Sequence, residues 1–186
     1  MVDFLVTGIR LNCETKPDLF SPKGLDSGTR ILLESVPKVM PDYQSAIDWG
    51  CGWGAIGIIL AKCNPHAEAI ALDSDIAAVS TAQANKELNG VTNLTVIASH
   101  GFDQVEADKK FDLITSNPPT HRGREVVETM ISQSLTRLNN DGVLLIVIEA
   151  RLKPWVARQM KEAFGNYRIV KRSPKHVVLK AVKMVQ

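Results

Sequence analysis

The chain contains no apolar run that approaches the length needed to span a membrane. Its N-terminal stretch, MVDFLVTGIR, carries an acid at Asp3 and has no basic region ahead of an apolar core, which argues against a secretory signal peptide. There is also no internal repeat, no low-complexity tract and no Pro/Gly/Ser linker long enough to separate two domains. We therefore expect a single domain over residues 1–186, in a cytoplasmic protein with no membrane partner.

Cysteine is scarce. Cys13, Cys51 and Cys63 are odd in number and lack the close spacing of metal ligands. This pattern indicates reduced thiols, and it predicts neither a disulfide framework nor a bound metal. The sequence also lacks a convincing proton-relay pair of the Tyr-x-x-x-Lys kind, which disfavours a nicotinamide-dependent oxidoreductase.

Acidic residues are nearly missing from the C-terminal part of the chain. Residues 151–186 carry ten Lys/Arg and one acid, Glu162, for a net +9, whereas the first 150 residues hold 12 Lys/Arg and 19 Asp/Glu, for a net −7. Such a split suggests an anionic partner for the basic part. The alternative is a solvated basic helix followed by an edge hairpin that lysines protect from aggregation.

Hydrophobic periodicity and turn residues predict alternating strands and helices after a short N-terminal β-hairpin and one helix. The hairpin joins FLV to IRLNCE, and DSGTRILLESV is expected to be a helix capped by Ser27. Strands are expected at 45–49, 67–73, 94–98, 110–116, 142–150, 167–172 and 176–182, and helices at 53–63, 75–90, 124–140 and 153–165. This alternation predicts an α/β fold, a Rossmann-like doubly wound sheet of about seven mostly parallel strands with an antiparallel C-terminal hairpin strand.

The segment DWGCGWGAIG, residues 48–57, follows a strand and opens a helix. Glycines in such a loop let the backbone approach a ligand, and the helix N-terminus presents free N–H groups. Gly52, Gly54 and Gly57 match the dinucleotide fingerprint G-x-G-x-x-G, a weak signal by itself. Asp48 at the mouth of the loop would repel a pyrophosphate and suits the cationic amino group of S-adenosylmethionine. A tight turn without a ligand is the alternative.

Polar residues also follow the next two strands. Asp73 lies about 20 residues after the glycine loop, where an acid accepts hydrogen bonds from ribose hydroxyls. Its alternative role is to cap the following helix, alone or with Ser74 and Asp75. Ser99 and His100 follow the third strand, where a polar side chain can reach an adenine, although His100 could equally face solvent.

The stretch SNPPT, residues 116–120, leaves the fourth strand through an asparagine and two prolines. Pro118 and Pro119 can neither donate to a sheet nor continue a helix, so they fix an extended turn. The Asn117 side-chain oxygen and the Pro118 carbonyl can then accept the two hydrogens of an sp² amine and turn its lone pair toward a methyl donor. A rigid loop without chemistry is the alternative, since Asn-Pro is common in turns.

In this order and spacing, DWGCGWGAIG, ALD and SNPPT resemble class I S-adenosylmethionine-dependent methyltransferases, over nearly the whole chain. The closer resemblance is to the small-domain methyltransferases, which include bacterial enzymes that methylate guanine N2 in 16S ribosomal RNA. DLFSPKGLDSGTRILLE resembles the segment of that group that covers the cofactor. We therefore expect an N-terminal hairpin and helix over residues 1–40 that cover the cofactor site, and a Rossmann-like core over residues 41–186.

The resemblance implies roles for individual residues. Asp48 and the loop glycines would line the methionine end of S-adenosylmethionine, Asp73 would hold its ribose, and Asn117 with Pro118 and Pro119 would hold the target amine. The full set expected around the cofactor is Thr29, Asp48, Gly50, Cys51, Gly52, Gly54, Asp73, Ser74, Ser99, His100 and Asn117.

Two positions depart from the family pattern. Thr120 stands where relatives usually carry a Phe or Tyr that stacks on a flat substrate, so an aromatic must come from Phe20, Trp53 or Trp155, or be absent. His100 replaces the more usual Asp or Asn of the adenine loop.

The resemblance and the basic C-terminal segment together predict a methyltransferase that uses S-adenosylmethionine and acts on an exocyclic amine, guanine N2 of ribosomal or other structured RNA. The residues expected to contact RNA are Thr120, His121, Arg122, Arg124, Lys171, Arg172 and Lys175. One alternative keeps the chemistry and changes the substrate to a protein Gln amide or a small amine. The other is a nucleotide- or RNA-binding module without catalysis.

Overall fold

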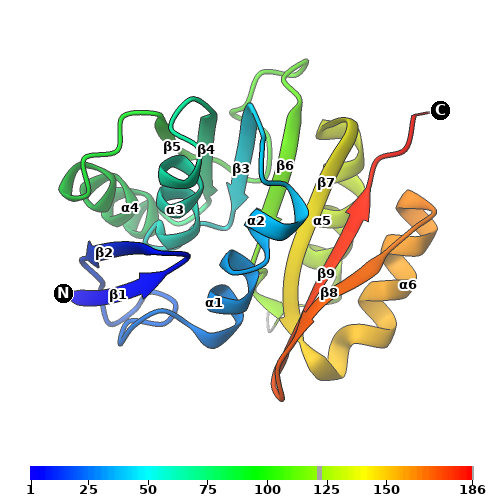
Figure 1. Ribbon diagram of the computed structural model, residues 1–186, viewed down its shortest axis with the longest axis horizontal. Coiled ribbons are helices and arrows are strands. Elements are labelled where there is room, and N and C mark those ends of the chain that lie inside the picture. Colours follow the sequence, from blue (N-terminus) through cyan, green and yellow to red (C-terminus); the bar gives the residue numbers. More distant parts are fainter. Residues whose placement is uncertain (121–122, 186) are drawn as a thin grey trace.

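A central seven-stranded sheet and a separate two-stranded hairpin make up the β-structure of the computed structural model, which describes residues 1–120 and 123–185 (Figure 1). The hairpin is formed by β1 (Val2–Val6) and β2 (Ile9–Cys13). The sheet strands are β3 (Ser45–Trp49), β4 (Glu68–Asp73), β5 (Leu94–Ala98), β6 (Phe111–Ser116), β7 (Leu138–Glu149), β8 (Arg168–Arg172) and β9 (His176–Val182). The helices are α1 (Ser27–Leu33), α2 (Val36–Val39), α3 (Ala55–Cys63), α4 (Ile76–Leu88), α5 (Arg124–Arg137) and α6 (Lys153–Phe164).

The strands lie in the order β5-β4-β3-β6-β7-β9-β8. Strands β3 to β7 pair in parallel, whereas β9 is antiparallel to both β7 and β8. The predicted α/β sheet, its antiparallel C-terminal strand and the N-terminal hairpin are confirmed. The strand order reverses between β3 and β6, and ligands of this fold class bind beyond the carboxyl ends of the strands at such a point. These ends face the lower edge of the sheet in Figure 1.

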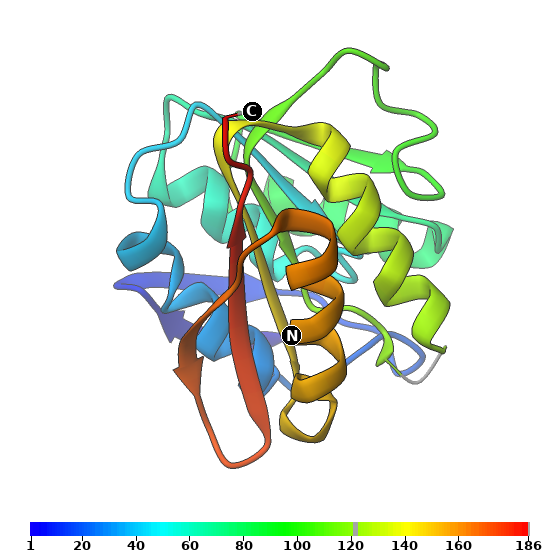
Figure 2. The same ribbon diagram turned by 90° about the vertical axis from the view of Figure 1, so that its right-hand side faces the viewer.

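Helices cover both faces of the sheet. Successive side chains of a strand point to opposite faces, so the neighbours Ala46 and Ile47 of β3 enter two different cores. Ala46 packs in the core that contains residues of α1, α3 and α4, and Ile47 packs in the core that contains residues of α5 and α6. Figure 2 shows the resulting layers, with α1 and α3 on one side of the sheet and α5 and α6 on the other.

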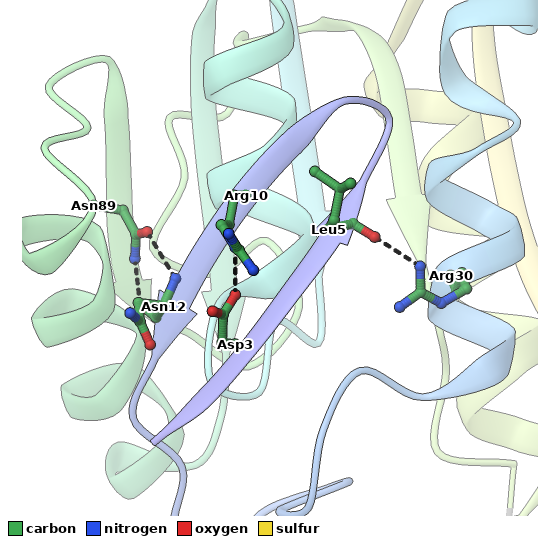
Figure 3. A network of polar contacts seen from close by, with 6 residues as sticks. All are labelled: Asp3, Leu5, Arg10, Asn12, Arg30 and Asn89. Atoms are coloured by element: carbon green, nitrogen blue, oxygen red, sulfur yellow. Dashed lines mark hydrogen bonds and ion pairs between the residues drawn. The ribbon is translucent and has the colours of Figure 1, made fainter.

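The N-terminal hairpin is fixed to two helices of the same face (Figure 3). Near one end, the Asn89 side chain after α4 accepts the Asn12 N–H at 3.3 Å and donates to the Asn12 carbonyl at 2.8 Å. Near the other end, Arg30 of α1 donates to the Leu5 carbonyl at 2.8 Å. The chain that leaves β2 is therefore anchored before it crosses the carboxyl edge of the sheet.

The start of α1 differs from expectation. Its cap is Asp26, whose Oδ2 accepts the Thr29 N–H at 3.0 Å. The predicted cap, Ser27, instead places its hydroxyl 3.2 Å from Nδ1 of His176 in β9. The Ser27–His176 contact joins positions far apart in the chain, so local sequence could not predict it.

In the described ranges, no helix is long and apolar enough to cross a membrane.

Candidate active site

A pocket of about 870 Å³ opens at the carboxyl edge of the sheet, beside the point where the strand order reverses. The glycine loop, the ends of β4 and β5, the Asn-Pro-Pro turn and residues 18–26 all contribute to its wall. The predicted site residues that line it are Thr29, Gly50, Cys51, Gly52, Asp73, Ser74, Ser99, His100, Asn117, Pro118, Pro119 and Thr120. The fold thus brings most of the residues singled out from sequence motifs to one cavity.

The glycine loop adopts a backbone that only glycine takes up without strain. Gly50, Gly52 and Gly54 have φ values of 81°, 53° and 93°. The Gly52 N–H donates to Oδ2 of Asp73 at 2.9 Å, which ties the loop to the end of β4. Contrary to the expectation, Gly54 does not line the pocket. It packs against α4 instead, where an added Cβ would lie 3.0 Å from the Cβ of Ala82. Its glycine is required for helix packing.

Asp48 lies under the glycine loop and does not line the pocket, contrary to the expected position at the loop mouth. The alternation of β3 turns its side chain toward α3, where Oδ2 accepts the Gly57 N–H at 2.9 Å. Its Oδ1 has no hydrogen-bond partner among the described residues. Complete burial raises the pKa of Asp48 to about 7; the Gly57 hydrogen bond opposes this rise and nearby Asp73 adds to it.

Burial of Asp48 predicts a specific pH dependence of stability. Since its folded pKa of about 7 exceeds the ordinary 3.8, the folded protein keeps a proton that the unfolded chain releases. The contribution of this group to the free energy of unfolding therefore falls as pH rises from about 4 to about 7, by at most about 1.4 kcal/mol per pH unit, and is level above pH 7.

The variant Asp48→Asn keeps an acceptor for the Gly57 N–H and removes the titration. Urea unfolding of both proteins between pH 4 and pH 8 should show the variant gaining stability relative to the parent up to about pH 7. A stability difference that does not change with pH would contradict the burial of an ionisable Asp48.

Asp73 faces the pocket with part of its hydrogen-bonding capacity unused. Its Oδ1 accepts the Asp75 N–H at 3.0 Å and its Oδ2 accepts the Gly52 N–H at 2.9 Å. A carboxylate oxygen carries two acceptor sites, so each oxygen can accept one more hydrogen bond. The helix-cap alternative for Asp73 is wrong, because Asp75 caps α4 by accepting the Ala77 N–H at 2.8 Å.

Three further pocket residues differ in what they can offer a ligand. The buried Ser99 donates to the Gly101 carbonyl at 2.8 Å and accepts the Gln104 N–H at 3.1 Å, so its hydroxyl shapes its own loop. His100 and Ser74 are exposed at the pocket and remain available for contacts.

The Asn117 amide is oriented by the start of α1. Its Nδ2 donates to Oδ2 of Asp26 at 3.1 Å and to Oγ1 of Thr29 at 2.9 Å. These two bonds use both amide hydrogens, and no described residue donates to the Asn117 oxygen. The Pro118 carbonyl accepts the Thr120 N–H at 2.8 Å and keeps a second lone pair. Two acceptors of the turn therefore remain for a ligand. The sequence did not indicate a site role for Asp26, because its contact with Asn117 joins residues far apart in the chain.

Glu149 and His176, at the pocket end of β7 and β9, were also missed. They stand opposite each other in the register of the two strands, and both line the pocket. Thr120 donates to Oε1 of Glu149 at 3.2 Å, and Arg151 Nε donates to Oε2 at 2.6 Å. Hydrogen bonds from Arg151 and then Thr120 lower the pKa of Glu149, so it carries its charge near neutral pH. The position of Glu149 at the end of a buried strand is the feature of the sequence that could have indicated a site residue.

The three aromatic candidates are now distinguishable. Trp53 is buried, packs edge-on to Phe4 at 5.8 Å and donates to the Phe20 carbonyl at 2.9 Å. Trp155 lies under the Arg124 guanidinium, 5.2 Å from it. Phe20 is 58% exposed and lines the pocket, so it is the candidate whose ring is free to stack on a ligand.

The predicted RNA contacts are only partly supported by position. His121 and Arg122 lie outside the described residues. Arg124, Arg172 and Lys175 are exposed. Lys171 forms an ion pair with Glu34 at the end of α1, so its charge is already balanced within the protein, which favours Arg172 and Lys175 as the RNA contacts.

Acidic side chains dominate the pocket charge. Its described lining holds seven Asp or Glu residues and neither Lys nor Arg. The acids are Asp18, Asp26, Asp73, Asp75, Asp103, Glu125 and Glu149. Such a lining suits a cationic ligand and opposes a polyanionic dinucleotide. Within the part of the chain that the structure describes, no group of three His, Cys, Asp or Glu could hold a metal ion.

A family comparison agrees with this site. The model of the methyltransferase small domain matches residues 10–180. The chain belongs to the methyltransferase small domain family. A Bacillus subtilis relative, the uncharacterized protein YbxB, is 32% identical over 168 residues, covering 89% of this chain and 83% of its own.

Two further relatives carry more informative names. Ribosomal RNA small subunit methyltransferase C of Actinobacillus pleuropneumoniae is 37% identical over 177 residues, covering 92% of this chain and 52% of its own. The structure of the T. thermophilus 16S rRNA N2 methyltransferase RsmC, in complex with AdoMet and guanosine, superposes with a TM-score of 0.89 at 26% identity. That match covers 98% of this chain and 50% of RsmC, so the chain spans about half the length of these methyltransferases.

Proposed function

We propose that this protein transfers a methyl group from S-adenosylmethionine (AdoMet) to the N2 amine of a guanine in structured RNA, ribosomal RNA in the first instance. The observation that carries the proposal is the Asn-Pro-Pro turn, whose Asn117 amide is fixed by Asp26 and Thr29 with its oxygen left for a ligand. The choice of guanine N2 is supported by the name of the T. thermophilus relative, a 16S rRNA N2 G1207 methyltransferase.

The pocket fits AdoMet on its own chemistry. Its acidic lining complements a ligand that carries a sulfonium and an ammonium group and no phosphate. Gly50 and Gly52 allow close backbone approach, and Asp73 has acceptor sites left for ribose hydroxyls. When bound, AdoMet supplies an electrophilic methyl group. The buried Asp48 would act indirectly, by accepting the Gly57 N–H of α3 and so fixing the start of this helix under the loop.

Asn117 and Pro118 would perform the chemistry by positioning. The amide oxygen of Asn117 and the carbonyl of Pro118 accept the two hydrogens of the N2 amine, which directs its lone pair away from both. Bound AdoMet would supply the methyl group, with the new N–C bond replacing the methyl–sulfur bond and the electron pair of that bond staying on sulfur. Nitrogen then loses one proton to solvent or to a nearby carboxylate, so no strong base is required.

Residues 1–40 would form the cover of the cofactor site and residues 41–186 the core. Six residues of the segment from Asp18 to Asp26, both ends included, line the pocket, and Asp26 contacts Asn117 directly. The Asn12–Asn89 hydrogen bonds anchor the start of this segment on α4. The cover is thus part of the same folded unit as the core.

The RNA backbone would lie outside the acidic pocket, on the exposed cations near its edge. Arg172 and Lys175 flank the β8–β9 turn, next to the pocket residue His176. Phosphate contacts by such side chains release counterions, which makes RNA affinity salt-dependent.

Replacing Arg172 and Lys175 together by Ala should weaken RNA binding and reduce the slope of log affinity against log salt by about two units. Lys171→Ala is the matched control, because Lys171 is paired with Glu34 and should leave the slope unchanged. AdoMet affinity, measured by calorimetry, should be equal in all three proteins. A double variant with the salt slope of the parent would contradict the proposed backbone contact.

The function itself is tested by transfer of labelled methyl groups to three substrates, namely RNA that lacks native modifications, a protein extract, and a mixture of small amines. We expect label in RNA alone, and calorimetry should detect AdoMet binding without NAD binding. Label in protein or in small amines would replace the RNA substrate, whereas NAD binding without AdoMet binding would overturn the methyltransferase assignment.

A further inference from the structure

The side chain at position 120 has a partner that explains why it is not aromatic. Thr120 Oγ1 donates to Oε1 of Glu149, across the gap between the ends of the neighbouring strands β6 and β7. Both residues line the pocket together with Asn117 and Pro118. A Phe or Tyr at position 120 could not make this bond in the same way and would occupy space beside the carboxylate.

Glu149 is held as an ionised acceptor. From a solvent-exposed position, Arg151 donates to Oε2 at 2.6 Å and to Oε1 at 3.3 Å, and Thr120 donates a third hydrogen bond, to Oε1. The Oε2 atom keeps an unused acceptor site, since a carboxylate oxygen can accept two hydrogen bonds. A charged acceptor is therefore placed beside the turn proposed to hold the amine.

We infer that Glu149 selects guanine by accepting the hydrogen of guanine N1, with Thr120 as the residue that positions it. This inference rests on the proposed function. Guanine presents the N1–H next to its N2 amine, so Asn117 and Pro118 can hold the two amine hydrogens while Glu149 holds the third donor of that edge. Adenine and 2-aminopurine carry a lone pair at N1, which a carboxylate repels, and a site built to pair a donor rejects analogues that lack it.

The test uses the shortest ribosomal RNA fragment that the parent methylates, synthesised with either guanine or 2-aminopurine at the methylated position. Both bases carry the N2 amine, and only guanine carries the N1–H. The parent should prefer guanine by about a hundredfold in kcat/KM. Glu149→Ala should lose about that factor on guanine and with it the preference, because no acceptor remains for the N1–H and no carboxylate remains to repel the N1 lone pair of 2-aminopurine. Glu128→Ala, the same change on an exposed part of α5 outside this pocket, should keep the guanine preference.

Variants of Thr120 test whether this residue positions Glu149. Thr120→Val should reduce the preference for guanine over 2-aminopurine, and Thr120→Ser, which retains the hydroxyl, should restore it. Thermal unfolding and AdoMet affinity identify any variant that fails to fold.

A folded Glu149→Ala protein that keeps the guanine preference of the parent would overturn the inference while leaving the proposed function intact. If the parent methylates protein or small amines and no RNA, the proposed function is wrong and this role of Glu149 is wrong with it.

Discussion

Replacing Asn117 with alanine is expected to reduce methyl transfer at least about a hundredfold, the scale for losing a positioned polar group at a reacting centre. The Asn117 oxygen is the acceptor of the turn whose orientation the fold controls, through the bonds of Nδ2 to Asp26 and Thr29. Those bonds lie on the side of α1, so their loss leaves the glycine loop and Asp73 in place. AdoMet affinity should therefore stay at the parent value.

Single-turnover kinetics with saturating AdoMet and RNA measures this effect apart from binding. The matched control is Asn140→Ala, an exposed asparagine of β7 that does not line the pocket. Near-parental turnover in a folded Asn117→Ala protein would remove the proposed role of the Asn-Pro-Pro turn.

Replacing Asp73 with alanine is expected to weaken AdoMet binding by about 1–3 kcal/mol, or roughly fivefold to 150-fold in dissociation constant. Two losses combine in this variant. The ribose hydroxyls would lose a charged acceptor, and the Gly52 N–H would lose the Oδ2 atom that ties the glycine loop to β4.

Asp73→Asn separates these two losses, because an Asn oxygen can still accept the Gly52 N–H while the negative charge is gone. We expect an affinity between those of the parent and Asp73→Ala. Asp42→Ala, at an exposed position outside the pocket, is the control. Calorimetry showing parental affinity in both Asp73 variants would contradict the ribose role.

Most of the fold was predictable because local signals agree with the tertiary structure. Each buried parallel strand reads as an apolar run, and glycine or polar residues separate it from the next helix. The boundary between α5 and β7 was less accurate. The helix ends at Arg137 and the strand begins at Leu138, where it pairs with Phe111, so residues 138–140 belong to the strand and not, as predicted, to the helix.

The candidate site was predictable where one short motif supplies both the residue and its place. The glycine loop, Asp73 and the Asn-Pro-Pro turn are of this kind, since strand ends in a doubly wound sheet meet at one edge. Side-chain partners from distant segments were not predictable. The Asp26–Asn117 and Thr120–Glu149 bonds, the burial of Asp48 and the Lys171–Glu34 ion pair each depend on which face of an element a side chain takes.

The most direct test of the central claim is the chemical identity of the methylated product. Unmodified small-subunit ribosomal RNA is incubated with the protein and labelled AdoMet, digested to nucleosides, and separated by chromatography with mass detection. The label should appear in N2-methylguanosine, and it should fall to background with Asn117→Ala. Label in any other nucleoside, or an RNA that stays unlabelled while protein or a small amine is methylated, would contradict the assignment of guanine N2 as the target.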